Sequence, residues 1–269
     1  MRGKDIPTLG LEGPNRILLT RLHRAFPGPF DLDEAAEALG LPRSRAGRLL
    51  SYLAARGWLS RVRRGLYTTV PLEATEPGSW LADPWVAASR SFAPCYIGGW
   101  TALHHWDLTE QLTSTVVVFT ATAVRKKKEI IQGTTIRLRQ ISEHRIFGTR
   151  TVWRDKVAVK VSDPERTLVD VLDRPDVGGG IRHVADCLVE WLDTDERRPR
   201  KLIEYGERHG NRSIFKRLGY LLEARESKET DLMTACAERM STGLSPLDPS
   251  SSSKGRVLKR WRLRVNARV

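Results

Sequence analysis

Apolar residues recur at helical spacing along residues 30–56, and their order predicts two helices in close succession. Over residues 32–39 the apolar positions share one face of a helix. Asp31 is a favourable N-cap for this helix, and Glu34 occupies the capping-box position three residues later. Gly40 ends it, because glycine tolerates the left-handed conformation that a C-cap requires.

A second helix is predicted from Pro42 to Arg56, with Ala46 and the leucines on its buried face. The opposite face is small and basic, and this helix contains no acidic residue. Arginine is the side chain that most often reads guanine, so such a face can approach base edges in the DNA major groove. The alternative is an ordinary amphipathic surface helix, whose free face usually mixes both signs of charge. The free face and its flanks comprise Arg43, Ser44, Arg45, Gly47, Arg48, Ser51 and Tyr52.

Residues 58–70 contain two runs of β-forming residues around a short turn with Gly65, which predicts a hairpin. Arg61, Arg63 and Arg64 place three cations on this hairpin, where they can grip a phosphate backbone or enter a minor groove. Helix, turn, helix and hairpin is the order of a winged helix-turn-helix, which lays one helix in the major groove. The sequence therefore predicts double-stranded DNA as a partner.

A helix over residues 14–26 would complete a three-helix core with these two helices. Residues 71–78 have the composition of a linker. We therefore predict a DNA-binding domain over residues 1–72 and a second domain over residues 79–269. The apolar face of the first helix consists of Ile17, Leu18, Leu22 and Phe26.

The second domain is predicted to contain strands first and most of its helices afterwards, so the fold class is α+β: an N-terminal winged helix-turn-helix followed by a larger mixed α/β domain. Arg137 and Arg139 lie on the polar face of one strand. Residues 256–265 are predicted as a strand that returns to the sheet, with a disordered basic tail as the alternative. Strands are predicted at 113–120, 134–141 and in a hairpin over 150–161, and helices at 84–92, 100–106, from 164 on, and near 180–192, 198–209, 213–225 and 228–240.

Charge is distributed in blocks along the chain, whose net charge is +13. Three basic blocks alternate with two mildly acidic ones, and such clustering indicates a polyanionic partner rather than a general gain in solubility. The net charges are +6 for residues 1–70, −4 for 71–120, +8 for 121–160, −4 for 161–249 and +7 for 250–269.

Several classes of function lack support in the sequence. The three cysteines are far apart and indicate neither a disulfide framework nor a zinc site, so we expect a reducing cytoplasm. No signal peptide is visible, and no run approaches the roughly 18 apolar residues of a membrane span, so we expect no membrane partner. No P-loop, nucleophile elbow, metalloprotease or dinucleotide motif occurs, so we expect no enzyme, no cofactor and no metal site.

Three weaker signals have simple structural interpretations. His104 and His105 are neighbours on a helix between tryptophans, which indicates packing rather than metal binding. The three glycines at 178–180 follow a helix rather than a strand, which favours a turn over a phosphate cradle. Asp163 is best used as the N-cap of a helix, so it is not expected to form a catalytic or metal-binding cluster with Asp170.

Several segments resemble those of the AbiEi-type antitoxins, bacterial transcriptional regulators paired with a nucleotidyltransferase toxin in type IV toxin–antitoxin systems. The likeness covers most of residues 30–269, and the combination of the hairpin with the Pro-Glu-Arg-Thr-Leu segment is its most specific part. The segments are Trp58–Tyr67, Tyr96–Trp106, Ser162–Asp170, Pro246–Pro249 and Arg260–Asn266.

The resemblance implies a winged-helix repressor domain joined to an α/β antitoxin domain. It also implies binding to operator inverted repeats, repression of the operon, and a nucleotidyltransferase toxin that is opposed without a stable complex, which is compatible with a monomer in solution. By resemblance, the DNA-contacting positions include Ser44, Arg45, Arg48, Arg61, Arg63 and Arg64. With the flanks of the helix, the predicted site is Arg43, Ser44, Arg45, Arg48, Ser51, Tyr52, Arg61, Arg63 and Arg64.

Two other interpretations remain open at this point. An enzyme or RNA-processing factor could use the winged helix only for docking, although no catalytic signature supports it. A module that binds a protein partner through the second domain is the other. The basic blocks at 121–160 and 250–269 depart from the family's pattern, which leaves open whether the second domain also contacts nucleic acid.

Overall fold

The computed structural model describes residues 13–71, 74 and 79–269. The chain forms two compact units, of which the first comprises Met1–Ser91 with Trp153–Val157 and the second comprises Phe92–Val152 with Ala158–Val269. Most of the predicted linker lies outside the described residues, and the predicted domain boundary within it stays a prediction.

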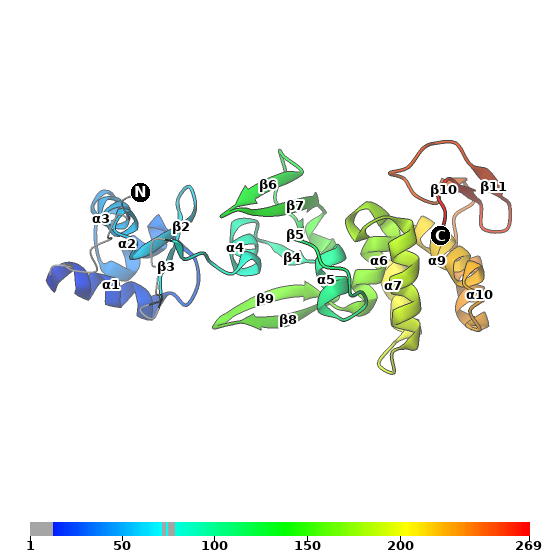
Figure 1. Cartoon of the computed structure of the whole chain (residues 1–269), viewed down its shortest axis with the longest axis horizontal. Coiled ribbons are helices and arrows are strands. Elements are labelled where there is room, and N and C mark those ends of the chain that lie inside the picture. Colours follow the sequence, from blue (N-terminus) through cyan, green and yellow to red (C-terminus); the bar gives the residue numbers. More distant parts are fainter. Residues whose placement is uncertain (1–12, 72–73, 75–78) are drawn as a thin grey trace, which may run out of the picture. The chain divides into compact units, whose positions relative to one another are not determined.

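The first unit contains a winged helix-turn-helix, as predicted (Figure 1). Its elements are α1 (Gly13–Ala25), β1 (Phe30–Asp31), α2 (Leu32–Leu39), α3 (Arg43–Ala55), β2 (Leu59–Arg63), β3 (Leu66–Thr69) and α4 (Pro84–Ser91). The strands form a sheet in the order β1-β3-β2. In the turn between β2 and β3, Gly65 has a φ of 80°, a conformation that glycine adopts without strain.

The ends of α2 follow from its capping residues. Asp31 Oδ1 accepts a hydrogen bond of 3.0 Å from the backbone of Glu34, and Glu34 Oε2 accepts one of 2.8 Å from the backbone of Asp31. The predicted capping box is thus confirmed. Gly40 ends α2 with a φ of 64°, as expected for a left-handed C-cap.

Two details of this unit differ from the prediction. Ile17 is 60% exposed, and Leu19 takes its place in the core beside Leu22. Ile17 precedes Leu22 by five residues and lies about 140° away around the helix, whereas Leu19 lies only about 60° away. The sheet also has a third strand, β1, because Phe30 pairs with Tyr67. Two residues are too few to give a strand pattern.

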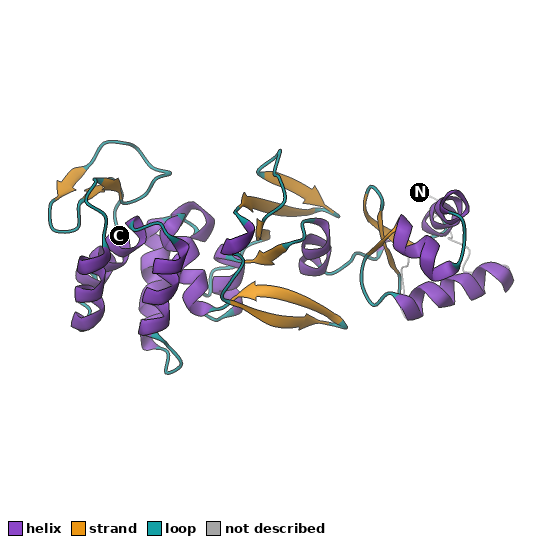
Figure 2. Ribbon diagram, turned by 180° about the vertical axis from the view of Figure 1, so that it is seen from behind, coloured by secondary structure: helices purple, strands orange, loops and turns teal. Residues whose placement is uncertain are grey.

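A six-stranded mixed sheet forms one layer of the second unit (Figure 2). It comprises β4 (Cys95–Ile97), β5 (Thr115–Thr120), β6 (Lys128–Ile131), β7 (Thr134–Gln140), β8 (Thr149–Arg154) and β9 (Val157–Ser162). Their order is β6-β7-β5-β4-β9-β8, with parallel pairs β5–β7 and β4–β9 and antiparallel pairs β4–β5 and β6–β7. The predicted strands and hairpin are confirmed, and β4 and β6 are additional.

Helices gather beside this sheet, with α6 among them at the centre of the core (Figure 1). They are α5 (Gly99–His105), α6 (Pro164–Asp173), α7 (Ile181–Asp193), α8 (Pro199–His209), α9 (Ser213–Ala224) and α10 (Thr230–Arg239). α6 packs against α5, α7, α8 and α9, and eight of its ten residues are buried. The predicted helices are confirmed, with ends that differ by a few residues.

The C-terminal segment differs from the prediction. It forms two short strands, β11 (Arg256–Leu258) and β12 (Leu263–Val265), which join β10 (Ser245–Pro246) in a separate sheet. The segment neither returns to the six-stranded sheet nor forms a disordered tail. Its anchor is Trp261, which is 1% exposed and lies against Gly219 of α9, so a helix rather than a sheet edge holds it.

Candidate nucleic-acid interface

Helix α3 buries its apolar face and exposes the opposite face. Ala46, Leu49, Leu50 and Leu53 are buried. Tyr52 is half-buried at the edge of the same core. The remaining predicted DNA-contacting residues of the helix are exposed, as the helical period predicts: Arg43, Ser44, Arg45, Arg48 and Ser51.

A surface hollow of about 540 Å³ lies between α3 and the hairpin, which we call the wing (residues 59–69). The structure brings three predicted residues together on the helical side of this hollow, Ser44, Arg48 and Ser51. Gly47, at the centre of that side, keeps it free of bulk. The wing contributes Gly65 and Tyr67 to the opposite side.

Three predicted residues of α3 lie outside the lining of this hollow. Arg43 forms an ion pair with Asp33 of α2, and both side chains are exposed. Arg45 is exposed on the flank. Tyr52 packs against the core, and Arg56 Cζ lies 5.4 Å from the centre of its ring, within the range of a cation–π contact. These residues flank the hollow rather than line it.

The three cations of the wing are exposed but not equivalent. Arg61 lies over the ring of Tyr67, with Cζ 6.0 Å from the ring centre. Arg63 Nη1 donates a hydrogen bond of 3.3 Å to the backbone oxygen of Ser91 at the end of α4. Arg64 lies at the tip, directly before Gly65. The wing therefore presents one cation at its tip and two that are also held by neighbours.

Sequence reasoning missed the part that Tyr67 plays in this surface. Tyr67 was predicted only as a strand residue, yet it lines the hollow and contacts Arg61. Its pairing opposite Arg61 on β2 depends on the register of the hairpin, which has a bulge between Arg61 and Arg63. The arginine-rich turn gave no signal of that irregularity.

The residues of the second unit that gave weaker sequence signals take part in structural contacts. Asp163 caps α6, as predicted, by accepting a hydrogen bond of 2.9 Å from the Arg166 backbone. Asp170 forms a buried ion pair of 2.9 Å with Arg166. His105 packs against Trp106, with ring centres 4.5 Å apart. In the described part of the chain, no group of three or more His, Cys, Asp or Glu side chains could hold a metal ion.

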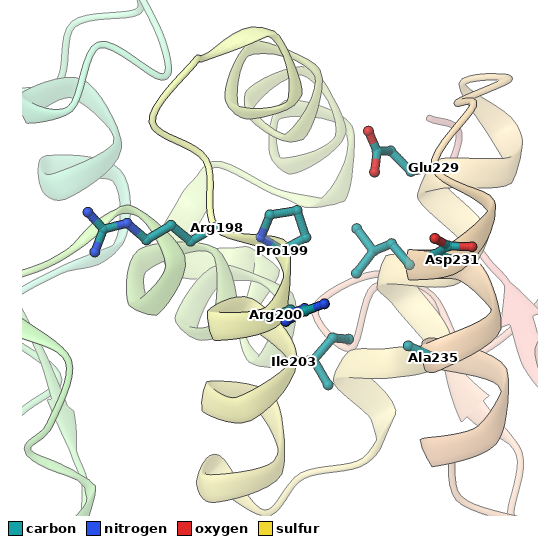
Figure 3. A pocket seen from close by; sticks show the side chains of 8 residues that line it. Arg198, Pro199, Arg200, Ile203, Glu229, Asp231 and Ala235 are labelled. Atoms are coloured by element: carbon teal, nitrogen blue, oxygen red, sulfur yellow. The ribbon is translucent and has the colours of Figure 1, made fainter.

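A further hollow of about 520 Å³ lies between α8 and α10 (Figure 3). Ile203 of α8 and Ala235 of α10 contribute an apolar surface to it. Its charged lining residues are equal in number, with two arginines at the start of α8 and two carboxylates, Glu229 and Asp231, at the start of α10. This hollow therefore does not select for a polyanion.

Residues 18–70 match the family model described as a transcriptional regulator, the AbiEi antitoxin. We call these residues the AbiEi-type segment, because they are similar to that family. The resemblance seen in the sequence is thereby confirmed over this range, which contains all nine predicted DNA-contacting residues. The AbiEi-type segment also includes both sides of the hollow between α3 and the wing. No helix among the described residues is long and apolar enough to span a membrane.

A solved structure is similar in fold to nearly the whole chain, beyond the AbiEi-type segment. The RV2827C protein from Mycobacterium tuberculosis, known from a crystal structure, superposes with a TM-score of 0.63 at 16% sequence identity. The likeness covers 94% of this chain and 92% of that chain, and it concerns the fold. No curated protein matches the chain.

Proposed function

We propose that this protein is a DNA-binding transcriptional repressor and antitoxin that binds operator inverted repeats through α3 and the wing. The observation that carries the proposal is the hollow that Ser44, Arg48 and Ser51 line within the AbiEi-type segment. An exposed helix face of small and basic residues beside a cationic hairpin suits the major groove and its flanking backbone.

The two sides of this surface have different roles in the proposal. Arg48 reads a base edge, because a guanidinium can donate two parallel hydrogen bonds to guanine, and Ser44 and Ser51 are short enough to let it approach. Arg61, Arg63 and Arg64 bind backbone phosphates, which fixes the register on the duplex without carrying sequence information. Arg43, Arg45 and Tyr52 flank the reading face and contact the adjoining backbone.

The functional partner in this proposal is a nucleotidyltransferase toxin from the same operon, counteracted without a stable complex. An inverted repeat presents the same sequence to two copies of the protein, one for each half-site. Each copy is then a monomer in solution and pairs with another only on the operator. The protein acts as a cytoplasmic regulator and not as an enzyme, which is in keeping with the AbiEi-type match.

Footprinting on the DNA upstream of the gene tests the repressor part of this proposal. The full-length protein should protect two inverted half-sites whose centres lie about 10 base pairs, or a multiple of that, apart. Absence of any protected upstream sequence would contradict it.

Coexpression with the adjacent toxin gene from an unrelated promoter tests the antitoxin part. Transcriptional repression cannot contribute there, so survival of the cells would report antitoxin activity alone. Death of cells that express the full-length protein would reduce the proposal to a repressor.

A further inference from the structure

A polar pocket of about 310 Å³ lies in the second unit, where β7 meets the C-terminal ends of α6 and α8. Four cations line it, Lys127, Arg139, Arg145 and Arg174. Asp173 is the carboxylate among the lining residues. The balance of charge therefore differs from that of the hollow between α8 and α10, where the two signs are equal.

Arg139 brings positive charge that is only partly neutralised. Its side chain is 18% exposed, and it shares the carboxylate of Asp176 with Arg137, so one anion serves two guanidinium groups. Arg139 Nε is buried and has no hydrogen-bond partner. Burial, together with the charges of Arg137 and Arg174, lowers the pKa of Arg139. An anion in the pocket would relieve this unfavourable environment.

The other three cations are available to a ligand. Lys127 and Arg174 are exposed, and Arg145 is half-buried. The ion pairs between side chains in residues 13–71, 74 and 79–269 include none of the three, although the charge of Arg174 acts on Asp173. Lysine and arginine side chains are the usual ligands of phosphate groups, because they combine positive charge with several N–H donors.

Asp173 offsets only part of this charge, because one carboxylate faces four cations and is also engaged by His209 and Asn211 in the wall. His209 Nδ1 lies 3.2 Å from Arg166 Nη1, and a guanidinium can only donate, so Nδ1 accepts. The other ring nitrogen of His209, Nε2, lies 3.1 Å from Asp173 Oδ2. Asn211 donates to the other oxygen of Asp173. Burial alone would raise the pKa of Asp173, but the contacts with His209 and Asn211 and the charge of Arg174 outweigh it and lower the pKa.

We propose that this pocket binds the phosphate group of a small ligand of the nucleotide class. A volume of about 310 Å³ is at the lower end of the range for small-ligand sites and suits a phosphate with a modest organic part. Phe119 and Leu138 supply an apolar wall for that part. The site is separate from the DNA-reading surface of α3 and does not depend on the function proposed for it.

A small ligand fits this pocket better than a DNA duplex. The side chain of Arg139 is 18% exposed and His209 is buried. A single phosphate group can reach side chains at this depth, whereas a stiff double helix cannot. The exposed cations Lys127 and Arg174 are the parts that a duplex could also reach. A comparison of small phosphates with duplex DNA therefore distinguishes the two sources of phosphate.

Isothermal titration calorimetry on the full-length protein tests the proposal with four probes: inorganic phosphate, adenosine 5′-monophosphate, adenosine and a duplex of scrambled sequence. We expect one site for the two small phosphates, with affinities tighter than about 1 mM, and no binding of adenosine. Lys127→Ala and Arg174→Ala should each weaken phosphate binding about tenfold, because each removes a charge-assisted hydrogen bond. Both side chains are exposed, so the fold should survive both changes.

Arg182→Ala is the matched control, since it removes one exposed cation from α7 that does not line the pocket. Unchanged phosphate affinity in this variant would support a defined site. Equal weakening in all three variants would overturn the proposal in favour of a general charge effect. Failure of both small phosphates to bind would overturn it too. So would pocket variants whose affinity falls for duplex DNA but not for the small phosphates.

Discussion

Arg48 is the side chain on which sequence reading depends in the proposed DNA complex, because it lines the hollow between α3 and the wing. Arg48→Ala should weaken binding to the operator by about 1–3 kcal/mol, and binding to scrambled DNA much less. Gel shifts on both sequences measure the difference. Arg56→Ala is the control, since Arg56 follows the same helix but lies over Tyr52 instead of in the hollow. An equal loss on both sequences would identify Arg48 as a phosphate contact.

The three cysteines give a second prediction for single residues. Cys95, Cys187 and Cys236 are buried, and burial raises the pKa of each thiol to about 12. The thiolate is the reactive form, so the folded protein should resist a thiol-specific reagent such as dithionitrobenzoate at pH 8. The same reagent should titrate all three thiols after denaturation in guanidinium. A thiol that reacts under native conditions would reveal local opening around it.

Among the elements, the wing should govern how DNA binding depends on salt. Arg64→Ala should reduce the slope of log K against log salt by about 0.9, which is the effect of one lost phosphate contact. Arg63→Ala should reduce it less, because Arg63 also donates to the backbone of Ser91. Binding measured over a series of salt concentrations tests both variants and their combination. A slope that the double variant leaves unchanged would show that the wing does not touch the backbone.

The contact between α9 and the C-terminal segment should be sensitive to a single methyl group. A Cβ atom at Gly219 would collide with the indole of Trp261, so Gly219→Ala should lower the free energy of unfolding by about 1–3 kcal/mol. Guanidinium denaturation of the full-length protein measures this. Trp261→Leu should lower the free energy of unfolding less in the Gly219→Ala variant than in the original chain, since the smaller leucine side chain leaves room for the added methyl group. Purely additive effects would contradict this packing.

Some helices and strands could be predicted from the sequence and others could not. The capping box of Asp31 and Glu34 and the exposed face of α3 were predictable because they depend on residues a few positions apart. The strand β1 was not, because its two residues become a strand only by pairing with β3. The pocket lined by Arg139 was missed because only the fold brings its cations together: three come from separate segments of the basic block at 121–160 and the fourth, Arg174, from the end of α6.

At the scale of the whole molecule, the chain should divide into two separable activities. A cut in the predicted linker should leave residues 1–72 folded and able to bind the operator, though more weakly, because the basic blocks at 121–160 and 250–269 are lost. Residues 79–269 should carry antitoxin activity. Gel shifts and coexpression of each fragment with the toxin from an unrelated promoter measure the two activities.

A fragment of residues 1–91 is the matched control for this division, because α4 belongs to the first unit. It retains the ion pair between Arg90 and Glu34 and the hydrogen bond from Arg63 to Ser91. Tighter operator binding by this fragment than by residues 1–72 would show that α4 supports the wing. Full protection from the toxin by either fragment would contradict the division of tasks.

The burial of Trp261 and Leu263 affects the order in which the two units can fold during synthesis. Both are buried in the same core as α6 and α9, so residues that leave the ribosome late complete the core of the second unit. The winged helix-turn-helix is synthesised first and contains its own hydrophobic core. Under the proposed function, a messenger RNA broken before codon 261 would yield a product that still binds the operator but lacks part of the core of its second unit. We then expect such a product to repress the proposed operon without protecting the cell, and to compete with intact protein for the same DNA.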